Sequence, residues 1–100
     1  MARGQTYEII ISPRARKRFK KLPKDSQKKI YSSLQALKEE PLTGYPLEKP
    51  FTQYRSLKVK ANRVEYRIIH QVKATSGEVW INLIEPREEV YKKLKNLLRQ

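Results

Sequence analysis

Five residues in the second half of the chain could together bind a phosphate and act on it. Alternation of apolar and charged residues predicts a strand whose Lys58 and Lys60 project from one face. Arg67 lies on the next predicted strand, and Arg87 and Tyr91 follow the last one. Clustered cations on a rigid sheet stabilise the charge that develops on a phosphorane, and a phenol can stack on a base or orient a hydroxyl. The pattern indicates RNA or DNA as the first ligand to consider.

Cleavage of RNA through its own 2′-OH also needs two proton transfers, from the attacking hydroxyl and to the departing 5′-oxygen. Crowded cations disfavour one another's charge, so a lysine of the pair Lys58 and Lys60 could exchange a proton near neutral pH. Structural alternatives exist for each residue. The two lysines also fit an ordinary solvated sheet face, and Arg67 could pair across strands with a carboxylate such as Glu78. Arg87 could pair with either glutamate that follows it, and the tyrosine could pack the last helix.

The remaining chemically notable residues favour structural roles. His70, the only histidine, is expected on the core-side face of its strand, which favours a half-buried structural side chain. Glu85 could be a base, but its position at a strand end beside basic residues favours a salt bridge. Trp80, Ile69 and Ile84 are expected to pack on one sheet face or to anchor a partner.

The charge of the chain points to a polyanionic partner. There are 23 Lys and Arg against 10 Asp and Glu in 100 residues, a formal net charge of +13. Self-repulsion of this size destabilises a compact state, and RNA, DNA or an acidic protein would offset it. The length suffices for one modest core, so we expect a single domain over residues 1–100, with 1–5 as a disordered leader.

The composition excludes several classes of function. The chain has no cysteine, so disulfide and thiolate chemistry are excluded. One histidine with scattered carboxylates argues against a transition-metal site. No apolar run approaches the roughly 20 residues that span a bilayer, and no signal-peptide pattern opens the chain. A cytoplasmic protein without a cofactor is therefore expected.

The elements that position these residues follow from periodicity and from their start and stop signals. Ser12 and Pro13 mark a helix start, Pro23 stops that helix, and Asn62 and Arg63 form a short hairpin turn. The last helix has an apolar stripe of Val90, Leu94, Leu97 and Leu98. The predicted elements are a strand at 7–11, a helix from 13 that stops before 23, a helix from about 24–26 to 40, a loop at 41–50, strands at 54–61, 64–73 and 78–84, and a helix at 87–99.

This order predicts an α+β fold. Three consecutive hairpin-linked strands make an antiparallel meander, and the two helices joined at Pro23 make a helical hairpin. We expect an antiparallel sheet of about four strands. The N-terminal helical hairpin packs on one face, and a C-terminal helix follows.

With this layout, the chain resembles the RelE toxins of the RelE/ParE superfamily over nearly its whole length. The segment Y-R-I-I-H-Q-V at 66–72 is similar to the tyrosine–arginine–aliphatic strand of that family. The segment P-R-E-E-V-Y at 86–91 is similar to its closing segment. The chain departs from the family in a shorter spacing between Arg87 and Tyr91 and in Pro86, where many relatives carry histidine.

The resemblance implies the toxin of a type II toxin–antitoxin system. Such a toxin is a ribosome-dependent endonuclease that cuts mRNA in the ribosomal A site by metal-independent attack of the 2′-OH. The products are a 2′,3′-cyclic phosphate and a 5′-OH. The residues that match the catalytic set of the family are Lys58, Lys60, Arg67, Arg87 and Tyr91.

The resemblance also implies the partners. These are the ribosome with its mRNA, ribosomal RNA, and an antitoxin that is acidic, is partly disordered alone and could displace the last helix. Six cations of the first helix could be a solvated face or, as we favour, salt-dependent contacts to ribosomal RNA: Arg14, Arg16, Lys17, Arg18, Lys20 and Lys21. Two other functions stay open, a ParE-like inhibitor of DNA gyrase and a basic RNA-binding protein without catalysis.

Overall fold

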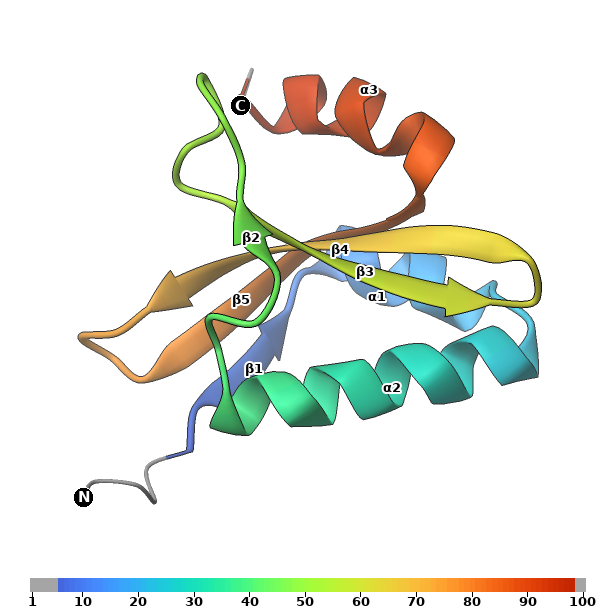
Figure 1. The fold of residues 1–100 in the computed structure, drawn as a ribbon, viewed down its shortest axis with the longest axis horizontal. Coiled ribbons are helices and arrows are strands. Elements are labelled where there is room, and N and C mark those ends of the chain that lie inside the picture. The colour runs from blue at the N-terminus through green and yellow to red at the C-terminus, as the bar shows by residue number, and fades with distance from the viewer. Residues whose placement is uncertain (1–5, 99–100) are drawn as a thin grey trace.

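The computed structural model describes residues 6–98, so the leader expected at residues 1–5 lies outside it. None of the described helices is long and apolar enough to cross a membrane. Figure 1 shows the elements in chain order. They are β1 (Glu8–Ile11), α1 (Pro13–Lys20), α2 (Lys24–Glu39), β2 (Tyr45–Pro46), β3 (Arg55–Ala61), β4 (Val64–Lys73), β5 (Glu78–Pro86) and α3 (Arg87–Leu98).

The α+β fold is confirmed, but the sheet is mixed and has five strands in the order β1-β5-β4-β3-β2. The predicted meander β3–β4–β5 is antiparallel, whereas β1 runs parallel to β5. No hairpin joins β1 to its neighbour, so no local turn determined its direction. The strand β2 has two residues in the proline-rich loop and pairs with β3. Two residues are too few to show the alternation by which a strand is recognised.

The helical hairpin begins where the sequence predicts. Ser12 caps α1, because its Oγ accepts a hydrogen bond from the Ala15 amide at 3.1 Å. The same hydroxyl donates to the Asn82 carbonyl of β5 at 3.0 Å. The first turn of α1 is thereby tied to the sheet, and Pro23 separates α1 from α2.

Two cores lie on the two faces of the sheet. Figure 1 shows α1 and α2 on one face and α3 on the other. The first core contains Val59 and Ile84 beneath the helical hairpin, and the second contains Ile69 beneath α3 and the loop after β2. The prediction that Ile69 and Ile84 share a face with Trp80 was therefore wrong, and Trp80 is 40% exposed. Leu98, predicted in the apolar stripe of the last helix, is 41% exposed.

His70 is fully buried rather than half-buried. A β-bulge lies opposite it on β5: Ile69 pairs with Leu83, but His70 pairs with Ile81, so Asn82 is the extra residue. Burial lowers the pKa of His70, and the charge of Arg55 adds to this effect. The carbonyl groups of Ile68 and Pro41 oppose it.

This buried imidazole predicts a loss of stability in mild acid. An unfolded histidine binds a proton near pH 6.5, whereas the folded one resists protonation, so the unfolded state binds more protons as the pH falls below that value. The free energy of unfolding should decrease from pH 7.5 to 5.5 by at most about 1.4 kcal/mol per pH unit, the limit for one proton. Urea unfolding at both values measures the decrease. His70→Gln should flatten it, and an equal decrease in that variant would contradict the assignment.

Candidate nucleic-acid site

The predicted cations lie on the sheet face that α3 partly covers. Alternation along β4 puts Arg67 on the same face as Ile69, which contacts the core beneath α3. Lys58 is paired with Arg67 across the strands, so the two side chains leave the same face. Lys58 and Lys60 are exposed, and Arg67 is half-buried. The predicted separation of the two lysines from the apolar face of β3 is confirmed.

α3 brings the last two predicted residues to this face. Arg87 is its first residue, and Tyr91 lies one turn later. Both are exposed, Tyr91 by 52%, while Val90 and Leu94 pack the helix against the sheet. The alternative that Tyr91 packs the helix is therefore wrong.

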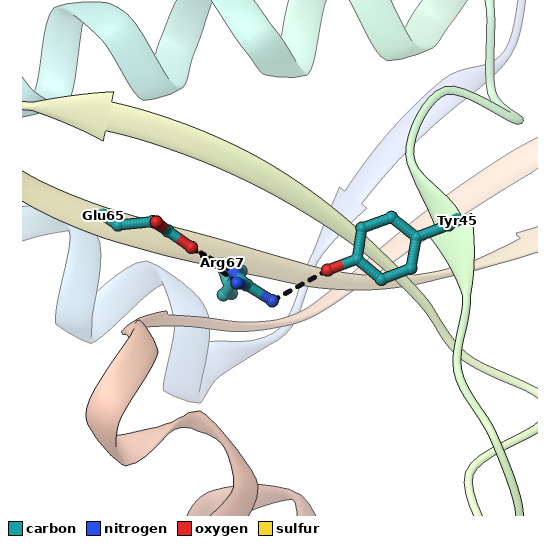
Figure 2. A network of polar contacts seen from close by, with 3 residues as sticks. All are labelled: Tyr45, Glu65 and Arg67. Carbon is teal, nitrogen blue, oxygen red and sulfur yellow. Dashed lines mark hydrogen bonds and ion pairs between the residues drawn. The ribbon is translucent and has the colours of Figure 1, made fainter.

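Arg67 is held by two neighbours, as Figure 2 shows. Its Nε donates to the Glu65 carboxylate at 2.9 Å, and its Nη2 donates to the same oxygen. Its Nη1 donates to the Tyr45 hydroxyl at 2.8 Å. Burial lowers the pKa of Arg67, but the hydrogen bond and charge of Glu65 outweigh it with help from Tyr45 and Tyr91, so the pKa is raised. The guanidinium stays charged and is fixed in orientation.

Glu65 lies at the centre of the cations. The hydrogen bond from Arg67 lowers its pKa, a partial desolvation opposes this, and the charges of Arg67, Lys58 and Arg87 lower it further. The charge of Tyr91 acts on Arg67 and raises its pKa. Three of the five predicted residues, Lys58, Arg87 and Tyr91, are therefore neighbours of the pair that Glu65 forms with the fourth, Arg67. We call these residues with Glu65 and Tyr45 the cation cluster. Lys60 faces Glu65 across the hairpin.

Sequence reasoning missed Glu65 and Tyr45. The sequence held a signal for Glu65, because residues two apart on a strand share a face and Glu65 is two residues from Arg67. Glu65, rather than the expected Glu78, provides the carboxylate that pairs with Arg67. Glu78 lies at the other end of the ladder, where it pairs with Lys73 and accepts from Trp80. No comparable signal existed for Tyr45, because its position depends on the pairing of β2 with β3.

Gly44 sets the position of Tyr45, and its substitution should be destabilising. Gly44 has φ +94°, and a Cβ there would lie 2.4 Å from the Ser56 carbonyl oxygen. Gly44→Ala should lower the free energy of unfolding by about 1–3 kcal/mol through left-handed strain and this clash, and should displace Tyr45 from Arg67. Gly77→Ala is the matched control, because Gly77 has φ +69° but open space around its Cα. Equal losses in urea unfolding would show that the contact with Ser56 does not matter.

Glu85 forms the salt bridge that its sequence context favours. It is 2% exposed, and its carboxylate lies 3.3 Å from Arg18 Nε of α1 and 3.7 Å from Lys93 Nζ of α3. Arg87, in contrast, has no carboxylate within ion-pair distance among residues 6–98, so its predicted pairing with a neighbouring glutamate is not found.

The basic run of α1 divides between two surfaces. Four of its cations line a concavity of about 460 Å³ that has Glu85 at its wall: Arg14, Lys17, Arg18 and Lys21. Arg16 and Lys20 line a different, more apolar pocket near β1. The run is therefore not one continuous face.

The cation cluster has the charge to bind a phosphate and to stabilise added negative charge.

Comparison with family models and with solved structures places the chain among toxins. The family model described as "ParE toxin of type II toxin-antitoxin system, parDE" matches residues 9–91. No curated protein matches this chain. Among solved structures, the toxin–antitoxin complex RelBE2 of Mycobacterium tuberculosis has 25% identity and a TM-score of 0.70 over 82% of this chain and 99% of that one.

Two further structures are similar in fold. A mutant of the E. coli toxin RelE in the free state has 21% identity and a TM-score of 0.72, covering 87% of this chain and 92% of that one. The archaeal RelE–RelB complex from Pyrococcus horikoshii has 22% identity and a TM-score of 0.58, covering 82% and 96%. The family-model match extends over most of the sequence, and the fold agrees with it. The chain thus belongs to the ParE toxin family of type II toxin–antitoxin systems, within the RelE/ParE superfamily.

Proposed function

We propose that this toxin is a ribosome-dependent endoribonuclease that cuts mRNA in the ribosomal A site without a metal or cofactor. One observation carries the proposal: Arg67 is fixed by Glu65 and Tyr45, lies opposite Lys58, and has Arg87 and Tyr91 of α3 near enough to act on the Glu65–Arg67 pair. An inhibitor that acts only by binding would not need a fixed guanidinium among further cations. A phosphoryl-transfer site does, because its donors must be in place before charge develops.

The reaction proceeds in one displacement. The 2′-oxygen attacks the adjacent phosphorus, the bond from phosphorus to the 5′-oxygen breaks, and a 2′,3′-cyclic phosphate and a 5′-OH form. Arg67 and Arg87 stabilise the phosphorane, and Tyr91 stacks on a base or orients the 2′-OH. One lysine of the pair Lys58 and Lys60, in its neutral form, takes the proton of the 2′-OH, and the other, as an ammonium, gives a proton to the departing 5′-oxygen, since Pro86 offers no side-chain acid.

The partners follow from this activity. The toxin acts in the cytoplasm on ribosomes, and the exposed cations of α1 contact ribosomal RNA phosphates. An acidic antitoxin covers the cation cluster in the inactive state. Support for an antitoxin comes from the similar solved structures that are themselves toxin–antitoxin complexes.

Cleavage of mRNA on programmed ribosomes tests the proposal. The parent should cut in the A site, while Arg87→Ala and Tyr91→Ala should cut far more slowly with unchanged folding. If the parent leaves mRNA intact and instead inhibits DNA supercoiling by gyrase, the proposal is wrong.

A gyrase inhibitor is the second candidate function, because the matching family model is described as a ParE toxin. The cation cluster separates the two candidates. A gyrase inhibitor should keep its toxicity in a host cell when Arg67 and Tyr91 are both replaced by alanine, whereas an endoribonuclease should lose it. A non-catalytic RNA-binding protein should not be toxic even as the parent.

A further inference from the structure

A groove of about 480 Å³ lies between α2 and β3, beside the cation cluster. Lys28 and Lys29 of α2 and Lys58 and Lys60 of β3 line it, and all four are exposed. We call it the lysine groove. The three ion pairs found within residues 6–98 join other side chains. The lining includes four lysines and no acidic residue, and a bound polyanion would offset their charge.

The edge of β3 adds backbone donors to this groove. Asn62 and Arg63, both with positive φ, close a two-residue hairpin between Ala61 and Val64. In such a hairpin the flanking pair is hydrogen-bonded, and the pairs then alternate. Lys58 and Lys60 therefore direct their amide groups away from β4, and the strand β2 pairs only with residues 55 and 56.

The lining of the groove fits a phosphate backbone better than a protein segment. Besides the lysines it contains only Ser32, Ser33 and Val59. Protein partners bind mainly through large apolar or aromatic anchors in desolvated pockets, and this groove offers no such pocket. Apolar side chains gather instead near the opposite edge of the sheet, where Tyr7, Ile9 and Phe19 help to line a separate pocket of about 650 Å³.

We propose that the lysine groove binds the sugar–phosphate backbone of a single RNA strand next to the phosphate held by the cation cluster. Lys58 belongs to both sites, so the strand passes from one to the other over the edge of β3. The inference rests on the proposed function for the identity of the strand. It assigns Lys28 and Lys29, which lie outside the catalytic set, to substrate binding.

Binding of a 2′-O-methyl RNA oligonucleotide tests the groove without requiring cleavage. The double variant Lys28→Gln/Lys29→Gln should bind it more weakly than the parent. The slope of log K against log salt should fall in magnitude by about 1.4, because each lost contact to a single strand contributes about 0.7. Lys28→Arg/Lys29→Arg should restore both. The control Lys49→Gln/Lys95→Gln removes the same charge from exposed sites elsewhere and should leave the slope unchanged.

The outcomes separate this inference from the proposed function. A reduced slope in the groove variant alone supports the groove, whether or not ribosomes are cut. An unchanged slope, or an equal change in both glutamine variants, overturns the groove even if cleavage by the parent upholds the function. Labelled polyglutamate is the probe for an acidic protein. If the groove variant loses polyglutamate binding while RNA binding stays as in the parent, the groove serves a protein partner and the inference is wrong.

Discussion

Replacement of Arg67 by alanine is expected to slow mRNA cleavage on the ribosome by about 10²–10³-fold, the effect of removing one preorganised donor from an anion-stabilising site. Glu65 and Tyr45 occupy the Nε, Nη2 and Nη1 donors on two sides of the guanidinium. The remaining N–H groups at its end are thereby fixed for a phosphate. The rate of cleavage under single-turnover conditions is the measurement, because it reports the chemical step rather than product release.

Two variants give this prediction its controls. Arg67→Lys keeps the charge but loses the planar fork, so it should restore little of the rate. Arg63→Ala removes an exposed arginine from the neighbouring turn and should leave the rate near that of the parent. All three proteins should melt within a few degrees of one another. Full activity of Arg67→Ala would remove Arg67 from the mechanism and, with it, the basis of the proposed function.

The parts of the site that sequence predicts correctly depend on local rules. The alternation along β3 separates Lys58 and Lys60 from the core, and the turn at Asn62 and Arg63 sets the register that brings Lys58 opposite Arg67. Both properties follow from a few adjacent residues. Sequence therefore predicts β4 with its bounds and the face from which Arg67 projects.

The parts that sequence does not predict depend on contacts between distant segments. Tyr45 reaches Arg67 only because β2 pairs with β3, across a loop without periodicity. The complete burial of His70 accompanies a bulge at Asn82 on another strand. Neither the pairing of a two-residue strand nor a one-residue register shift leaves a pattern in the residues themselves.

Glu85 gives rise to the largest expected effect on stability. Leaving a buried carboxylate without a counterion lowers stability strongly. A cation that is about one-third exposed loses less when its partner is removed, because water can solvate it. The side chains of Arg18 and Lys93 are 35% and 37% exposed, and that of Glu85 is 3% exposed. Arg18→Ala/Lys93→Ala should therefore lower the free energy of unfolding by about 3 kcal/mol, the lower end for a broken buried pair because solvent screens both partners.

The relative stabilities of these variants show whether the burial of an unpaired charge causes the loss. Each single variant leaves one counterion, so the double variant should cost more than the sum of the two singles. Glu85→Gln should cost less than the double variant, and in its background the loss of both cations should cost less than about 1 kcal/mol. If Glu85→Gln is as destabilising as the double variant, the carboxylate stabilises the fold directly, and the burial of an unpaired charge is not the cause.

The same ion pairs connect stability to the site. Lys93 lies on α3, the helix that carries Arg87 and Tyr91 to the cation cluster, and Arg18 fixes Glu85 from α1 on the other side of the strand. Because the carboxylate joins the two helices, its counterions hold α3 in the position from which both residues reach the face of Arg67. Arg18→Ala/Lys93→Ala should consequently lose cleavage at temperatures where it is still folded. Glu85→Gln, which leaves no buried charge, should retain more of it, and the reverse order of activities would contradict the connection.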